Sequence, residues 1–255
     1  MDLSQNDELN RCMTFVKQEI YPRLENTVDE IHSLMDGLNG KFVKKGPSGA
    51  PSRGNAHILP TGRNFYTTDP TEIPTRSWET GKKLANQLLE THKAEIGEIP
   101  ENIAIVVYSG ETIKTNGDDI AEILYLYGIR PVWLGETDKV IGLEVIPLEE
   151  LGRPRIDVTL RISGLFRDTF PNLIELVDEA VNMVASLEEE HECNFIKKHI
   201  ENDVMQFVKA GMNYEQAYDQ ASLRIFGCPP GTYGAGVDIL INSKKWETSD
   251  DLGKA

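Results

Sequence analysis

Hydrophobic residues near the start of the chain recur with a helical period. From Leu9 to Leu38, apolar side chains fall three or four positions apart, which is the spacing of one face of an α-helix. Pro22 interrupts this pattern, and proline is tolerated in the first turn of a helix far better than in its interior. We therefore expect two helices that meet near Tyr21, end around residues 37–40 and pack on each other rather than on a partner.

The hydrophobic period is lost in residues 45–76. The stretch from Gly46 to Arg76 holds five prolines and four glycines, and a loop of this length is uncommon in a compact domain unless it is functional or disordered. Ile58, Leu59 and Phe65 supply apolar anchors, which favours a functional loop. A helix that begins at about residue 75 is predicted to follow.

Alternation of strand and helix patterns marks the middle of the chain. Residues 102–108 are a continuous apolar run, as in a strand buried on both faces of a parallel sheet. A polar loop, a helix to Tyr127 and the capping residue Gly128 come next. Residues 130–134, 143–146 and 156–162 are further candidate strands. The predicted fold class is α/β, a parallel Rossmann-like sheet flanked by helices, with additional helices at both ends.

The last third of the chain is predicted to be mostly helical. One helix begins at Pro171, a second spans about residues 194–210, and a third begins after the N-cap candidate Asn213. Residues 227–236 form a second dense Gly/Pro loop. The expected organisation is an N-terminal helical pair (1–44), a Gly/Pro-rich loop segment (45–76), an α/β domain (77–190) and a C-terminal helical segment (191–255).

The loop at residues 109–118 leaves a buried strand and enters a helix. In an open α/β sheet, ligands often bind at this place. The free N–H groups of the helix start, together with Lys114, could hold an anion. The glycine spacing matches neither a dinucleotide fingerprint nor a Walker motif, so nucleotide binding is not supported. An ordinary β–α turn is an equally open interpretation of this loop.

Residues 161–171 repeat this order of strand, glycine turn and helix. Arg161 and Arg167 could bind carboxylates through paired N–H donors. The alternative is that Arg167 and Asp168 form an ion pair or cap where the helix begins. His57, in the first Gly/Pro loop, titrates near neutral pH and is a candidate ligand, although a polar surface role is the plainer interpretation.

Composition narrows the possible classes of protein. A formal net charge of −15 opposes nucleic-acid binding, which needs basic faces. No apolar run reaches the roughly 18 residues of a membrane helix, and early acidic residues argue against a targeting peptide, so we expect a cytoplasmic protein without a membrane span. Cys12, Cys193 and Cys228 are far apart, which predicts neither disulfides nor a zinc site.

Four motifs together are much more specific than each one alone. GPSGAPSRG…LPTGRNFY, IAIVVYSGETIKTNGDDIAEILYLYGIRPVW, RISGLFRDTFPNLIELVDEAV and GCPPGTYGAGV occur in this order. The sequence resembles the family of cobaltochelatase CobN subunits and magnesium chelatase H subunits. The resemblance extends over about residues 35–250, nearly the whole chain.

The resemblance implies a function and a set of partners. Members of this family bind a tetrapyrrole and receive Co²⁺ or Mg²⁺ as a substrate, while separate AAA+ subunits hydrolyse ATP. The absence of a Walker motif agrees with this division, and we expect no cofactor bound by this chain itself. The expected substrate-binding residues are Arg53, His57, Arg63, Asn64, Tyr66, Glu111, Thr112, Lys114, Arg161, Arg167, Asp168 and Tyr233.

A tetrapyrrole needs an apolar or aromatic slot with arginines at its edge. We expect the turns that carry Arg63, Glu111 and Arg167 to converge on one such crevice. Family members are several times longer and carry an H-G-x-x-G-x-x-E-like string that this sequence lacks, so no catalytic residue is assigned. The chain is then expected to be a fragment of the large subunit that is inactive alone. The alternative is a non-catalytic α/β binding or scaffold domain derived from it.

Overall fold

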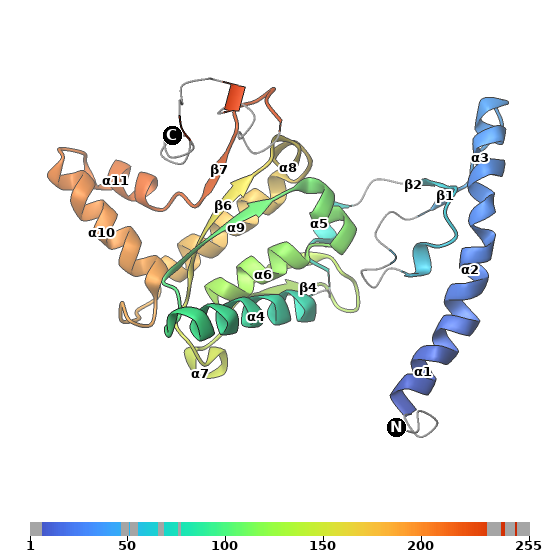
Figure 1. The fold of residues 1–255 in the computed structure, drawn as a ribbon. Coiled ribbons are helices and arrows are strands. Elements are labelled where there is room, and N and C mark those ends of the chain that lie inside the picture. The colour runs from blue at the N-terminus through green and yellow to red at the C-terminus, as the bar shows by residue number, and fades with distance from the viewer. Residues whose placement is uncertain are drawn as a thin grey trace. The chain divides into compact units, whose positions relative to one another are not determined.

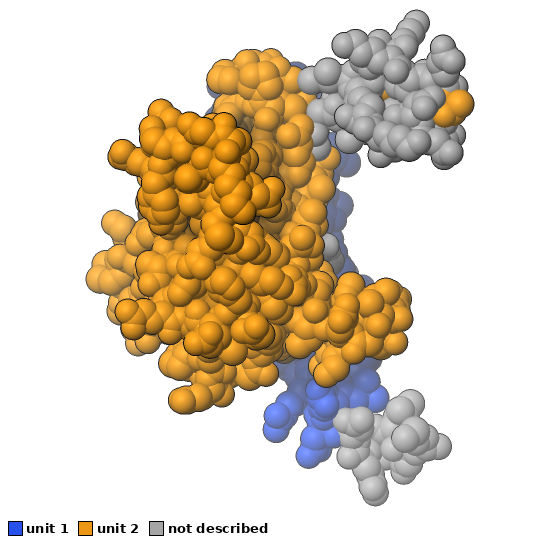
Figure 2. Space-filling model, turned by 90° about the vertical axis from the view of Figure 1, so that its left-hand side faces the viewer, with its two compact units in different colours: residues 1–68, 113–115 blue, residues 69–112, 116–255 orange. Residues whose placement is uncertain are grey.

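The computed structural model describes residues 7–46, 51, 56–65, 69–75, 78–233, 241–242 and 248, without the side chains of residues 57, 64 and 65. The chain divides into two compact units, coloured separately in Figure 2. Unit 1 consists of residues 1–68 and 113–115, and unit 2 of residues 69–112 and 116–255. Each unit is described by itself.

One helical run forms the first part of unit 1 (Figure 1). It consists of α1 (Asp7–Phe15), a π-helical turn (Val16–Ile20), α2 (Tyr21–Glu25), a 3₁₀ turn (Asn26–Val28) and α3 (Asp29–Leu38). The backbone stays right-handed helical where the segments join at Phe15 and Tyr21. The expected packing of two helices on each other is therefore wrong.

The π-helical turn explains why Pro22 does not break the run. Pro22 lies in the first turn of α2, and the Tyr21 N–H reaches back to the Val16 carbonyl, five residues away. A wider turn of this kind relieves the clash between a proline ring and the preceding turn. Over the whole described run no residue is buried, and all its large apolar side chains except Ile20 are exposed.

The described part of the Gly/Pro-rich loop is attached to this run. It contains a 3₁₀ turn (Ala56–Ile58) and two short parallel strands, β1 (Lys45–Gly46) and β2 (Asn64–Phe65). Gly62 has a φ of +83°, and a side chain there would overlap the α3 backbone at Asp29 and Glu30. Arg23 also donates a hydrogen bond to the Leu59 carbonyl, at 3.5 Å.

A parallel three-stranded sheet forms the centre of unit 2. Its strands are β3 (Asn102–Val107), β6 (Asp157–Ile162) and β7 (Ile225–Gly227), in the order β3-β6-β7. The predicted α/β fold class, with a parallel sheet and helices, is confirmed. Two predicted strands are not part of this sheet, because β4 (Ile129–Trp133) and β5 (Val140–Val145) pair antiparallel as a separate hairpin.

Helices pack beside the sheet within unit 2. They are α4 (Trp78–Ile96), α5 (Ser109–Thr115, whose last three residues are grouped with unit 1), α6 (Asp118–Tyr127), α7 (Leu148–Leu151), α8 (Gly164–Thr169), α9 (Pro171–Ala185), α10 (Phe195–Lys209) and α11 (Tyr214–Ala221), with a 3₁₀ turn at Pro70–Glu72. Helix α6 is the most buried of them and packs against α4, α9 and β6. The predicted caps Gly128 and Asn213 are confirmed.

The described helices cover the sheet on one face. Along β3, Val107 is buried whereas Val106 is 54% exposed, so the expected burial on both faces is wrong. Parallel crossovers are right-handed almost without exception. The crossovers from β3 to β6 and from β6 to β7 step in the same direction, so both place their helices on the same face. Figure 1 shows α9 behind the strands.

A buried arginine connects the hairpin to the rest of unit 2. Arg155 is 1% exposed and donates hydrogen bonds to the carbonyls of Gly128 and Ile146, at 2.8 and 2.9 Å. Its guanidinium also binds both carboxylate oxygens of Glu189, at 2.8 Å each. Because a buried guanidinium needs a counter-charge, Glu189 is expected to be essential for stability.

Replacing Glu189 with alanine should lower the free energy of unfolding by about 3 kcal/mol, because Arg155 would keep a buried and unbalanced charge. Urea unfolding followed by circular dichroism measures this loss. Glu188→Ala, at an exposed neighbouring position, is the matched control and should change stability by less than about 0.5 kcal/mol. Equal stabilities of the two variants would contradict the assigned role of the Arg155–Glu189 pair.

Helix α6 also carries carboxyl groups in unfavourable surroundings. Burial raises the pKa of Asp119 to about 6. Burial, assisted by the charges of Asp118 and Asp119, raises the pKa of Glu122 to about 7. Since both pKa values lie above those of the unfolded chain, these groups stabilise the fold at low pH and lose that contribution as pH rises from about 4 to 7.

Glu122→Gln should therefore be more stable than the parent at pH 7.5, with a melting temperature higher by a few degrees. The difference should become much smaller at pH 4.5, where the Glu122 carboxyl is protonated in the folded chain and about half protonated in the unfolded chain. Thermal melts across this pH range test the expectation. Glu90→Gln on the exposed side of α4 is the control, and an equal difference at all pH values would refute the prediction.

Candidate functional site

The three parallel strands bring the segments that follow them to the same edge of the sheet. We call this the strand-end edge and define it as residues 108–112 after β3, 163–168 after β6 and 228–233 after β7. The predicted loop at 109–118 is instead largely the helix α5. The Ser163 N–H donates to the Val107 carbonyl at 3.0 Å, which joins the first two segments. Register pairs Val107 with Ile162 and Ile162 with Gly227, so the three strands end side by side.

Arg161 and Arg167 attach the third segment to the second. Arg167 donates from Nη1 to the carbonyls of Cys228 and Pro229, at 2.6 and 2.8 Å. Arg161 donates from Nη2 to the Cys228 thiol sulfur at 3.5 Å. Arg167 also pairs with Asp168 at 2.8 Å. This confirms the Arg167–Asp168 ion pair that the sequence analysis gave as the alternative. The two arginines thus position the 228–233 loop.

Glycine at position 164 lets this loop lie directly on the start of α8. A Cβ atom there would overlap the Thr232 carbonyl oxygen and approach the Tyr233 Cα within 3.0 Å. Ser163 caps the same helix by accepting a hydrogen bond from the Phe166 N–H at 3.2 Å. The Ser-Gly pair of the third motif, RISGLFRD, is therefore explained by a close approach of two backbones.

A side-chain hydrogen bond inside unit 2 fixes the segment that follows β3. Thr112 is fully buried, and its hydroxyl donates to Asp119 at 2.6 Å. Ser109 is 1% exposed, and its hydroxyl has no hydrogen-bond partner among the described residues. Glu111 is exposed. Of these side chains Glu111 faces solvent, whereas the Thr112 hydroxyl is engaged inside the domain.

Exposed aromatic side chains lie beside these loops. Tyr108, directly after β3, is 46% exposed, and Tyr233, next to Gly164, is 57% exposed. Phe166, which follows the same glycine turn, is 1% exposed and packs on Phe170, with ring centroids 5.4 Å apart. Phe166 thus belongs to the core and offers no face to a ligand.

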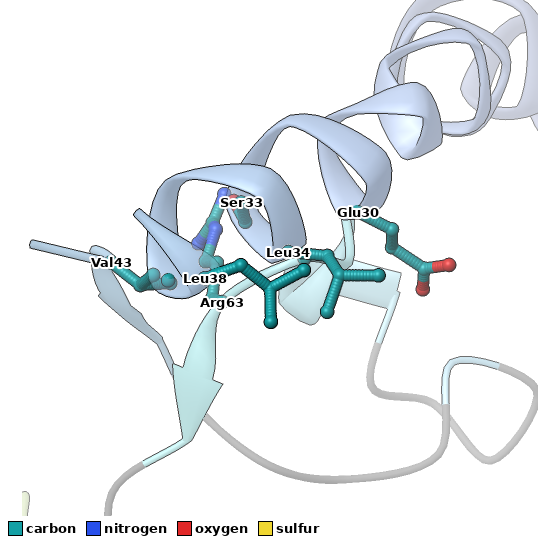
Figure 3. A pocket seen from close by; sticks show the side chains of 8 residues that line it. Glu30, Ser33, Leu34, Leu38, Val43 and Arg63 are labelled. Atoms are coloured by element: carbon teal, nitrogen blue, oxygen red, sulfur yellow. The ribbon is translucent and has the colours of Figure 1, made fainter. Parts of the chain in front are cut away.

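A separate pocket of about 440 Å³ lies within unit 1 (Figure 3). Its walls are largely apolar and come from α3 and the neighbouring loop. They consist of Glu30, Ser33, Leu34, Gly37, Leu38, Val43, Gly62 and Arg63. The stem of Arg63 lies over Gly46, where a side chain would overlap its Cδ atom. Arg63 thus adds a cation, and Glu30 a carboxylate, to a largely apolar wall.

The other predicted site residues are distributed over both units. Arg53 and Tyr66 lie outside the described residues, as do the side chains of His57 and Asn64. Lys114 belongs to the short segment grouped with unit 1. Glu111, Thr112, Arg161, Arg167, Asp168 and Tyr233 all come from the strand-end edge or the strand leading to it. The common crevice that would also include Arg63 stays a prediction.

Two features of the strand-end edge were missed by the sequence interpretation. Cys228 is 7% exposed and its backbone carbonyl receives Arg167, and Asp119 holds Thr112. Within the described ranges, no group of three or more His, Cys, Asp or Glu side chains is placed to hold a metal, and no helix there is long and apolar enough to cross a membrane.

Comparisons with known proteins agree with the motif resemblance. The CobN/Magnesium Chelatase family model matches residues 2–255. The aerobic cobaltochelatase subunit CobN of Pseudomonas aeruginosa is 46% identical over 88% of this chain and 18% of its own length. The chloroplastic magnesium-chelatase subunit ChlH of japonica rice is 38% identical over 98% of this chain and 17% of its own length.

A solved structure shows the same fold. The catalytic subunit of cobaltochelatase from Mycobacterium tuberculosis matches with a TM-score of 0.82 and 44% identity, over 94% of this chain and 20% of that one. This chain spans about a fifth of the length of the relatives it matches. From its sequence motifs, its fold and these matches, the chain belongs to the CobN/magnesium chelatase family.

Proposed function

We propose that this chain forms part of the tetrapyrrole-binding surface in the large subunit of an ATP-dependent metal chelatase, which inserts Co²⁺ or Mg²⁺ into a corrin or porphyrin ring. The observation that carries the proposal is the strand-end edge, where three family motifs meet. Names of the relatives, cobaltochelatase and magnesium chelatase, support the class of reaction.

The strand-end edge has the chemistry that a flat, carboxylate-bearing macrocycle requires. Tyr108 and Tyr233 present exposed aromatic faces, and aromatic rings stack well on flat conjugated ligands. Arg167 is partly exposed and fixed by Asp168 and the loop carbonyls. A guanidinium held in this way is preorganised to bind a carboxylate.

The pocket beside α3 is a second candidate contact for the ring. It combines the apolar side chains Leu34, Leu38 and Val43 with the Arg63 cation. A macrocycle edge with an apolar substituent and a carboxylate fits this combination. Arg63 is therefore proposed as a substrate contact in its own right.

The remaining steps of the reaction are assigned to other subunits and to the rest of the large subunit. ATP hydrolysis is proposed for separate AAA+ subunits, because the sequence contains no Walker motif. The metal ion is a substrate, and the group that removes the pyrrole protons is assigned to the part of the large subunit that this chain does not cover. The chain alone is expected to bind the ring without inserting metal, in the cytoplasm.

A porphyrin with two carboxylates, titrated into the chain and followed by tryptophan and tyrosine fluorescence, should bind with an affinity that depends on both arginines. Arg167→Ala and Arg63→Ala should each weaken binding about tenfold, because each removes one charge-assisted contact. Arg130→Ala, on the β4 hairpin, is the matched control and should bind like the parent. Unchanged affinity in both test variants would contradict the proposed function and favour a scaffold role.

The 228–233 loop can be tested without touching an arginine. Gly164→Ala should push this loop away from α8, because the new methyl group would overlap the Thr232 carbonyl. We expect weaker porphyrin binding and a stability loss of about 2 kcal/mol. Gly110→Ala, where nothing lies within 4 Å of the added methyl, should change neither. Equal behaviour of the two variants would show that the loop packing does not matter.

A further inference from the structure

The described residues of unit 2 leave one face of the central sheet open. The side chains of β3, β6 and β7 that point away from the helices form what we call the open sheet face: Ala104, Val106, Thr159, Arg161 and Phe226. Register places Val106, Arg161 and Phe226 in one row across the three strands. Val106 and Phe226 are 54% and 47% exposed, so the row presents two large apolar residues to solvent.

An open face of this kind is exceptional for a parallel sheet. Sheets with only parallel strands occur almost exclusively with both faces covered. Here both crossovers place their helices on the same side, and no described helix covers the open sheet face. The unpaired apolar area therefore indicates a missing layer of structure rather than a solvent-facing surface.

We propose that the open sheet face docks an amphipathic α-helix from the part of the large subunit that this chain does not include. Three strands about 4.8 Å apart form a strip roughly 10 Å wide, which is the diameter of one helix. The chain matches 17–20% of the length of its relatives, so such polypeptides contain ample chain for this layer.

Charge defines the chemistry of the proposed helix. Among the five positions of the open sheet face, Arg161 is the one charged residue, and its Nη2 already donates to the Cys228 sulfur. The docking helix should therefore be aliphatic where it covers Val106 and Phe226 and place no cation beside Arg161. A second copy of this chain fits poorly, because a two-fold axis through the centre of the row would place Arg161 against its own equivalent. It would also bring together two chains that each have a net charge of −15.

Lysine substitutions on the open sheet face, made in this chain and in a full-length relative, test whether another part of the large subunit covers the face. In this chain alone, Val106→Lys with Phe226→Lys should leave the melting temperature within about 2 °C, because both side chains already face water. In the full-length Methanocaldococcus jannaschii relative, 51% identical over 236 residues, lysine at the two aligned positions should lower it by roughly 5 °C or more, because the charges would be buried.

Val158→Lys on the covered face, where the residue is 0% exposed, is the positive control and should unfold this chain. Unchanged melting of the long polypeptide would overturn the proposal, because nothing would then cover the face. So would a large loss in the short chain. Light scattering that shows a dimer of this chain, dissociated by the two lysines, would assign the face to a second copy and also overturn it. None of these results depends on tetrapyrrole binding.

Discussion

Parallel pairing of β3, β6 and β7 is the constraint on which the arrangement of unit 2 depends. Backbone hydrogen bonds fix the register of Val107, Ile162 and Gly227, so the three loops that follow must begin at one edge. Motifs separated by more than fifty residues in the sequence become neighbours for this reason. Arg161 and Arg167 then connect the second loop to the third. The register of the sheet, more than any single residue, determines where the candidate site lies.

The two ends of this sheet are built differently. At the strand starts, Asp157 is 5% exposed and binds Arg224 at 2.6 Å and His199 at 2.8 Å. Glu101 adds contacts to His199 and Lys198. This network closes the amino ends with paired charges. The carboxyl ends carry glycine turns, exposed tyrosines and partly exposed arginines, which is the end of an α/β sheet where ligands bind.

Local sequence patterns correctly predicted the helix caps and the strand β6, which depend on residues close together in the sequence. Gly128 ends α6 with a φ of +77°, and Asn213 caps α11 through the Gln216 N–H at 2.9 Å. The alternation of residues 156–162 correctly predicted β6. Pro22 misled the interpretation, because the preceding π-helical turn that accommodates it has no sequence signature of its own.

Features that depend on tertiary contacts were not predictable in the same way. Residues 103–107 are apolar at every position, so their one-sided burial was hidden. If another part of the large subunit covers the open sheet face, β3 needs apolar residues on both faces. That requirement explains why residues 103–107 are apolar at every position. The involvement of Cys228 and the pairing of Thr112 with Asp119 depend on distant segments meeting. The predicted roles of Arg53, His57 and Tyr66 remain predictions.

Hydrogen exchange with and without a dicarboxylic porphyrin tests the central claim most directly, because it maps where the ligand acts on the backbone. The account predicts slower exchange together in residues 108–112, 163–168 and 228–233, with little change at the strand starts near Glu101 and Asp157. Protection spread evenly over the chain, or confined to the starts of the strands, would contradict a ligand site at the strand-end edge.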